Sequence, residues 1–188
     1  MVDDKELLAA IVLSEASVEG KEGMQAVLNT MMNRTGTVNL QTLLDEAKSL
    51  HAYEGYTKGK KKGLSTFIDS YKKTKDAVLQ NQWSEVLAFI DLAVTKDSEG
   101  KSQLSDITGG ATHYLNPDVQ KELGRSLPSW ALWESGSSKK IGSHLFGIPL
   151  TADDVKKVEF SEAWSRGRSI MGPGSKFEWI DRKEYLTD

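Results

Sequence analysis

The sequence contains no cysteine and no long hydrophobic run. Without cysteine the chain has no disulfide, no cysteine-ligated zinc or iron–sulfur site and no thiol nucleophile. The apolar run at residues 7–13 is far shorter than the ~20 residues that a membrane-spanning helix needs. The residues before it include acids where a secretory signal would carry Lys or Arg, so we expect neither a signal peptide nor a membrane span.

The sequence also lacks a strong excess of either charge. Its 24 Lys and Arg residues nearly balance 27 Asp and Glu residues, which leaves a formal net charge of -3. This balance gives no general attraction to nucleic acid, so we expect no nucleic-acid partner. A length of 188 residues with 38% hydrophobic and 27% charged residues is typical of one globular domain, which we expect to span residues 1–188.

The spacing of apolar residues predicts a mainly α fold. Helices are expected at residues 5–16, 24–34, 40–47, 66–80 and 83–95, and shorter ones at 153–157 and 161–168. The helices at 66–80 and 83–95 are expected to form a hairpin whose turn contains Asn81 and Gln82. Residues 51–63 and 96–106 are expected to be loops, and the chain up to residue 149 is expected to stay rich in loops with little β-structure.

Glu15 is the first candidate for a chemical role. Leu8, Ile11, Val12 and Glu15 follow the spacing i, i+3, i+4, i+7, which places the carboxylate on an apolar helix face. A buried carboxylate is costly unless it is paired, hydrogen-bonded or neutral, and a carboxyl group kept neutral can serve as a general acid. The alternative is that Glu15 lies at the end of the helix and turns to solvent or to an arginine.

Three segments around and beyond Glu15 resemble the spore-cortex-lytic, cell-wall-hydrolase family. They are EASVEGKEG at residues 15–23 with NR at 33–34, TGGATHYLNP at 108–117, and WA at 130–131 followed by IGSHLFG at 141–147. SLHAYEG at 49–55 is a looser match. Ser17, Val18, Leu115 and Ser143 depart from the usual residues of the family. We therefore expect a family-like core over residues 1–147 and a C-terminal extension over 148–188.

The resemblance implies a single lysozyme-like, lytic transglycosylase-like domain that cleaves peptidoglycan glycan strands. The bond would be the β-1,4 link between N-acetylmuramic acid and N-acetylglucosamine, with Glu15 as the catalytic acid and base and with no cofactor or metal. Ordinary glycosidases need a second carboxylate, for which Glu19, Glu22 and Asp106 are candidates. A transglycosylase needs one carboxylate, because the 6-hydroxyl of muramic acid closes a 1,6-anhydro ring. The resemblance favours this route.

The same segments supply the other candidate site residues. Tyr53, Thr112, His113 and Tyr114 are expected to contact the sugar chain. The alternative for His113 and Tyr114 is a buried, hydrogen-bonded pair that braces its loop. Structural support of the site is expected from Glu19, Glu22, Asn33 and His144.

Two other functional classes remain open at this stage. The first is a zinc-dependent wall amidase or peptidase, although His51, His113 and His144 form no local metal-binding motif. The second is a catalytically silent wall-binding or virion structural protein. Because peptidoglycan lies outside the membrane and no export signal is found, we expect a bacteriophage protein. It would be an endolysin that waits in the host cytoplasm for release by a holin, or a lysin carried in the virion.

Overall fold

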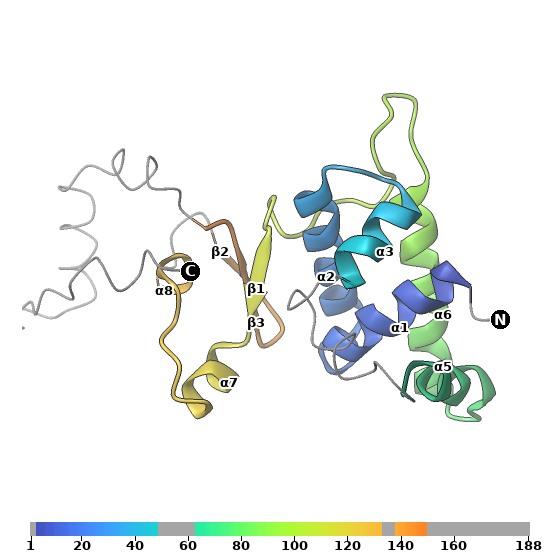
Figure 1. Ribbon diagram of the computed structural model, residues 1–188, viewed down its shortest axis with the longest axis horizontal. Helices are drawn as coiled ribbons and strands as arrows, with labels where there is room; N and C mark the ends of the chain where they lie inside the picture. The colour runs from blue at the N-terminus through green and yellow to red at the C-terminus, as the bar shows by residue number, and fades with distance from the viewer. Residues whose placement is uncertain (1–2, 49–62, 133–137, 150–188) are drawn as a thin grey trace, which may run out of the picture.

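The computed structural model of the protein describes residues 3–48, 63–132 and 138–149. The fold is mainly helical, with one small three-stranded antiparallel sheet (Figure 1). The elements in chain order are α1 (Asp4–Ala16), the 3-10 helix η1 (Ser17–Glu19), α2 (Gly20–Thr35), α3 (Leu40–Lys48), α5 (Gly63–Lys73), α6 (Ala77–Val94), β1 (His113–Leu115), α7 (Pro117–Glu122), α8 (Ser129–Leu132), β2 (Ser138–Ile141) and β3 (His144–Gly147). None of the described helices is both long enough and apolar enough to cross a membrane.

Helix α1 is the central helix of the helical part of the fold. It begins after Asp3, whose side chain accepts a hydrogen bond from the amide of Glu6 at 2.7 Å. Every residue from Leu8 to Leu13 is fully buried, because α2, α3, α5 and α6 all pack against this helix. The helix itself was predicted correctly, but the expectation of a single apolar face is wrong. A helix that is apolar all round is a buried one, and α1 reaches the surface only in its first turn and again at Ser14 and Glu15.

The helical hairpin expected after residue 66 exists, but its turn was predicted at the wrong place. The break between α5 and α6 lies at residues 74–76, and Asn81 and Gln82 lie inside α6. Asp76 is the N-cap of α6, and its carboxylate accepts a hydrogen bond from the amide of Val78 at 2.8 Å. Such a cap satisfies an amide that has no partner within the helix. Apolar periodicity continues across the break, so the capping aspartate was the better signal.

This boundary can be tested with two alanine substitutions. Asp76→Ala is expected to lower the free energy of unfolding by about 1 kcal/mol, because it removes the cap of α6. Asn81→Ala is expected to be neutral or slightly stabilising, because Asn81 is exposed within a helix and alanine has the higher helix propensity. Urea denaturation of both variants measures the difference. A larger loss for Asn81→Ala would place the turn where the periodicity suggested.

The sheet has the strand order β1-β3-β2 and stands beside the helices (Figure 1). Strand β1 is the short β-favouring stretch expected from the sequence, whereas the β2–β3 hairpin was expected to be loop. The hairpin turns at Gly142 and Ser143, because Ile141 pairs with His144 and Gly142 adopts a φ of 59° that suits glycine. One face of the sheet packs towards α2 and the other towards α8.

The other helices and loops predicted from the sequence are partly confirmed and partly outside the described residues. The helices predicted at 40–47 and 24–34 are confirmed as α3 and α2, although α2 begins earlier, at Gly20, directly after η1. The helices expected at 153–157 and 161–168 lie outside the described residues. So do the C-terminal extension beyond residue 149 and all but the last residue of the loop expected at 51–63.

Candidate functional site

Glu15 lies in the last turn of α1, at the point where this helix leaves the core. Its side chain is half-buried, and its Oε2 accepts a hydrogen bond of 2.9 Å from the hydroxyl of Tyr114. Tyr114 is the central residue of β1, in the second of the three motif segments. The carboxylate therefore stands neither deep in the core nor free in solvent, but at the junction between the helices and the sheet.

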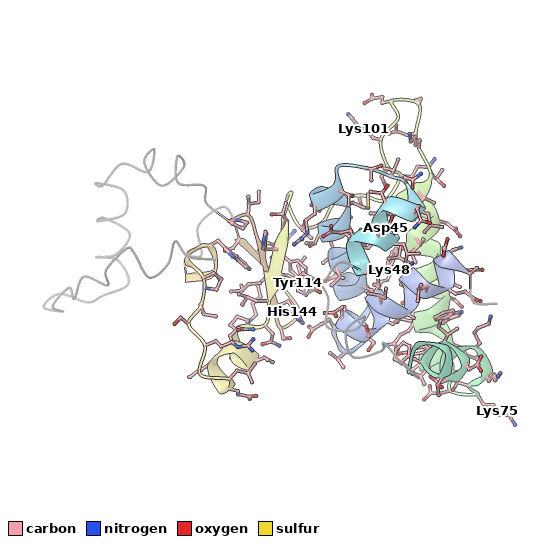
Figure 2. The ribbon with its side chains drawn as sticks, viewed as in Figure 1. Asp45, Lys48, Lys75, Lys101, Tyr114 and His144 are labelled. Atoms are coloured by element: carbon pink, nitrogen blue, oxygen red, sulfur yellow. The ribbon has the colours of Figure 1, made fainter. Side chains whose placement is uncertain are left out.

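The ring of Tyr114 is fixed by neighbours on the same face of the sheet. It stacks on Phe146 with ring centroids 5.5 Å apart and meets the edge of His144 at 5.6 Å. Strand pairing explains this, because Tyr114 lies opposite Phe146 and His144 is two residues from Phe146. Figure 2 shows Tyr114 and His144 on the side of the sheet that faces α1 and α2. These contacts direct the Tyr114 hydroxyl towards Glu15.

His113 lies on the opposite face of the sheet, since consecutive residues of a strand alternate in direction. Its ring is 6.4 Å from that of Trp130 in α8, and its Nδ1 is 3.0 Å from the hydroxyl of Thr112. Partial desolvation, and after it the positive charge of Arg34, hold the pKa of His113 below its ordinary value. The imidazole is therefore neutral near pH 7. The alternative for these two residues, a buried and hydrogen-bonded pair of His113 and Tyr114, is wrong, because the two rings point to opposite faces.

Glu19 connects the start of α2 to the turn of the β2–β3 hairpin. Its carboxylate accepts hydrogen bonds from the amide of Ser143, at 2.7 Å, and from the Ser143 hydroxyl. Nδ1 of His144 lies 3.3 Å from Oε1 of Glu19, and the two side chains are only 15% and 9% exposed, respectively. Glu19 precedes α2 but makes no capping hydrogen bond with its side chain. It therefore anchors the hairpin, in keeping with the structural role expected for Glu19 and His144.

Two glycines leave room for the Glu19 side chain. A Cβ atom at Gly23 would overlap the Cβ of Glu19, and a Cβ at Gly142 would overlap its Oε2. Gly23 lies one helical turn after Glu19, whereas Gly142 lies in the third motif segment. The sequence shows both glycines, but only the folded chain reveals that they serve the same carboxylate.

Glu19 and Asp106 are both ionised at neutral pH. Burial by itself raises the pKa of Glu19, but the hydrogen bonds from Ser143 and the attraction of His144 outweigh it and hold this pKa below its usual value. Partial desolvation likewise raises the pKa of Asp106, and hydrogen bonds from Thr108, Gly110 and Asn33 lower it by more. Both carboxylates thus hold backbone segments in place.

The remaining residues predicted from the sequence are Asn33, Glu22, Thr112 and Tyr53. Asn33 donates from Nδ2 to the carbonyl of Ala111 at 3.0 Å, which supports its expected structural role. Glu22 is exposed in the first turn of α2. Thr112 directly precedes β1, and its amide donates a hydrogen bond of 3.1 Å to the carbonyl of Gly147. Tyr53 lies outside the described residues. Ser143 and Phe146 were not predicted, although both lie in the third motif segment.

In the part of the chain that the structure describes, no group of three or more His, Asp or Glu side chains is arranged to hold a metal ion. Comparison of the chain with family models, with curated proteins and with solved structures finds no match. What the site does is therefore inferred from its residues and their geometry.

Proposed function

We propose that the protein is a lysozyme-like glycosidase that cleaves the glycan strands of peptidoglycan, with Glu15 as its acid and base. The hydrogen bond from Tyr114 to Glu15 carries this proposal. The three motif segments resemble the wall-hydrolase family in sequence, and they lie far apart along the chain. That bond unites the first two segments at the expected carboxylate, and the bonds from Ser143 to Glu19 unite the first with the third.

The proposed reaction uses the Glu15 carboxyl twice. Protonated Glu15 donates its proton to the glycosidic oxygen, and the C1–O bond of N-acetylmuramic acid breaks as an oxocarbenium-like sugar forms. The ionised carboxylate then takes the proton of the 6-hydroxyl of the same sugar while O6 bonds to C1. Glu15 ends in its starting state and the product carries a 1,6-anhydro ring. The Tyr114 hydroxyl orients the carboxylate and stabilises its ionised form between the two steps.

The surroundings of the three other candidate carboxylates, Glu19, Glu22 and Asp106, favour this single-carboxylate route over hydrolysis. A retaining glycosidase needs a second carboxylate about 5–5.5 Å from the acid as nucleophile, and an inverting one needs a base farther away. Glu19 is bound by Ser143, and Asp106 is bound by Thr108 and Gly110. Glu22 is exposed in the first turn of α2. We therefore expect closure of the anhydro ring by the substrate's own hydroxyl.

Mass spectrometry of the products tests both the bond that is cut and the route. The full chain is incubated with purified peptidoglycan, and the soluble fragments are expected to end in 1,6-anhydro-N-acetylmuramic acid. Fragments with reducing N-acetylmuramic acid ends would support a glycosidase that works by hydrolysis and would overturn the transglycosylase route. Released peptides, or activity that a chelator abolishes, would point instead to a zinc amidase or peptidase. No fragments at all would point to a wall-binding or structural protein.

A further inference from the structure

One face of α2 carries a row of side-chain amides, spaced four residues apart, that all hydrogen-bond the segment before β1. Residues spaced by four lie one above another on a helix, so the row can follow an extended segment along the helix axis. The bonds are Gln25 Nε2 to the carbonyl of Ser105 at 2.9 Å, the amide of Ile107 to Oδ1 of Asn29 at 3.1 Å, and Asn33 Nδ2 to the carbonyl of Ala111 at 3.0 Å. Helix α2 is thus hydrogen-bonded to residues 105–111 at both ends of this segment and between them.

Asp106 fixes the shape of this segment from within. Its carboxylate accepts hydrogen bonds from the amides of Thr108 and Gly110, each at 2.7 Å, and from Nδ2 of Asn33 at 3.2 Å. Gly109 and Gly110 both have positive φ values, 73° and 85°, which allow the chain to turn around the carboxylate. Asn33 contacts both this carboxylate and the carbonyl at the end of the segment.

The segment leads directly into the strand that carries Tyr114. Ala111 is followed by Thr112, whose amide makes the first hydrogen bond to β3, and then by β1. A strand that slips by one residue turns each side chain to the other face. The carbonyl that Asn33 holds is therefore three residues from the hydroxyl that meets Glu15. A shift of this carbonyl would therefore move the start of β1 and, with it, the Tyr114 side chain.

We infer that Asn33 is a positioning residue for the site. By holding Ala111 and Asp106, it sets where β1 begins relative to α1, and so places the Tyr114 hydroxyl at Glu15. The kinetic consequence of this inference rests on the proposed function, whereas the placement of the segment does not.

A double-mutant cycle tests whether Asn33 acts through Tyr114. Asn33→Ala is expected to lower kcat about tenfold with KM changed by less than about twofold, because the lost hydrogen bonds affect orientation and not sugar contacts. In the Tyr114→Phe background the same substitution is expected to lower kcat by less than about twofold, because the hydroxyl that it positions is already absent. Equal losses in both backgrounds would overturn the inference.

Asn39→Ala is the matched control. Oδ1 of Asn39 accepts a hydrogen bond from the amide of Thr42 at 3.1 Å, so this side chain caps the start of α3 and not the segment 105–111. This variant also loses an amide that holds backbone, but we expect its kcat to stay within about twofold of that of the unmodified protein. An equal loss of kcat in Asn39→Ala would mean that general destabilisation explains the effect of Asn33→Ala, and would overturn the inference.

Hydrogen exchange tests the placement without any activity. In Asn33→Ala, the amides of Thr108, Gly110 and Thr112 are expected to exchange at least about tenfold faster, while those of α6 stay unchanged. Unchanged exchange at these three amides would overturn the inference even if the protein is not a glycosidase. If Asn33→Ala does not fold, Asp106→Asn loosens the same contacts from the loop, at an exposed position. In Asp106→Asn, the amides of Thr108, Gly110 and Thr112 are expected to exchange faster by a similar factor, and the fall in kcat is expected to shrink in the Tyr114→Phe background. Unchanged exchange at these three amides would overturn the inference.

Discussion

Glu15→Gln is expected to abolish glycan cleavage while the protein remains folded. Loss of a general acid or base costs about 10²–10⁴-fold in rate, and here one group serves both steps, so we expect a loss at the upper end of this range. Glutamine has the volume of glutamate and keeps a carbonyl oxygen that can accept the Tyr114 hydrogen bond. Release of soluble muropeptides measures the rate, and a thermal melt checks that the variant is folded.

Glu22→Gln provides the control for this substitution. Glu22 is exposed in the first turn of α2, seven residues after Glu15, and the change removes the same charge from the same part of the chain. Its expected cost is at most about 1 kcal/mol of stability, from the lost interaction with the helix dipole, with the cleavage rate within about twofold. Wild-type cleavage by folded Glu15→Gln would show that another group is the acid.

Gly142→Ala is expected to have the largest effect on stability. A residue other than glycine at a φ of 59° costs about 1–2 kcal/mol, and the new Cβ would also displace the Glu19 carboxylate from Ser143. A partly buried hydrogen bond to a charged group contributes about 1.5–3 kcal/mol. Together we expect a loss of about 3 kcal/mol or more in urea denaturation. Cleavage should fall as well, because the hairpin carries the His144 and Phe146 rings that hold Tyr114.

Gly36→Ala separates the backbone cost from the effect on Glu19. Gly36 ends α2 with a φ of 62°, almost that of Gly142, but a Cβ there would meet no atom within 4 Å. We expect Gly36→Ala to cost only the backbone term of about 1–2 kcal/mol. Equal losses in the two variants would mean that the bonds between Glu19 and Ser143 add nothing to stability.

The contribution of Glu19 should also depend on pH in a definite direction. Its pKa is lower in the folded protein than the usual 4.5, so the unfolded chain binds its proton more readily. The stability that Glu19 provides is therefore complete above about pH 5 and is lost as the pH falls through the lowered folded pKa. In Gly142→Ala, whose Glu19 is displaced, we expect stability to vary less with pH below 4.5 than in the unmodified protein.

Three of the helices and the candidate carboxylate Glu15 can be predicted from the amino-acid sequence alone. Apolar spacing located α1, α2 and α3, since this periodicity is a local property of the chain. It could not reveal that α1 is buried all round, because that depends on four other helices packing against it. It misplaced the turn between α5 and α6 because the apolar pattern runs through the break that Asp76 caps.

Which of the motif residues contact each other is seen only in the folded chain. Strand alternation directs Tyr114 to Glu15 and His113 to the opposite face, although the two are adjacent in the sequence. The β2–β3 turn brings Ser143 to Glu19, and Gly23 and Gly142 leave the space that this carboxylate fills. Contacts between residues about a hundred positions apart depend on strand register and helix packing. No local pattern in the sequence specifies either, so the residue types of the site were evident from the chain while their pairing was not.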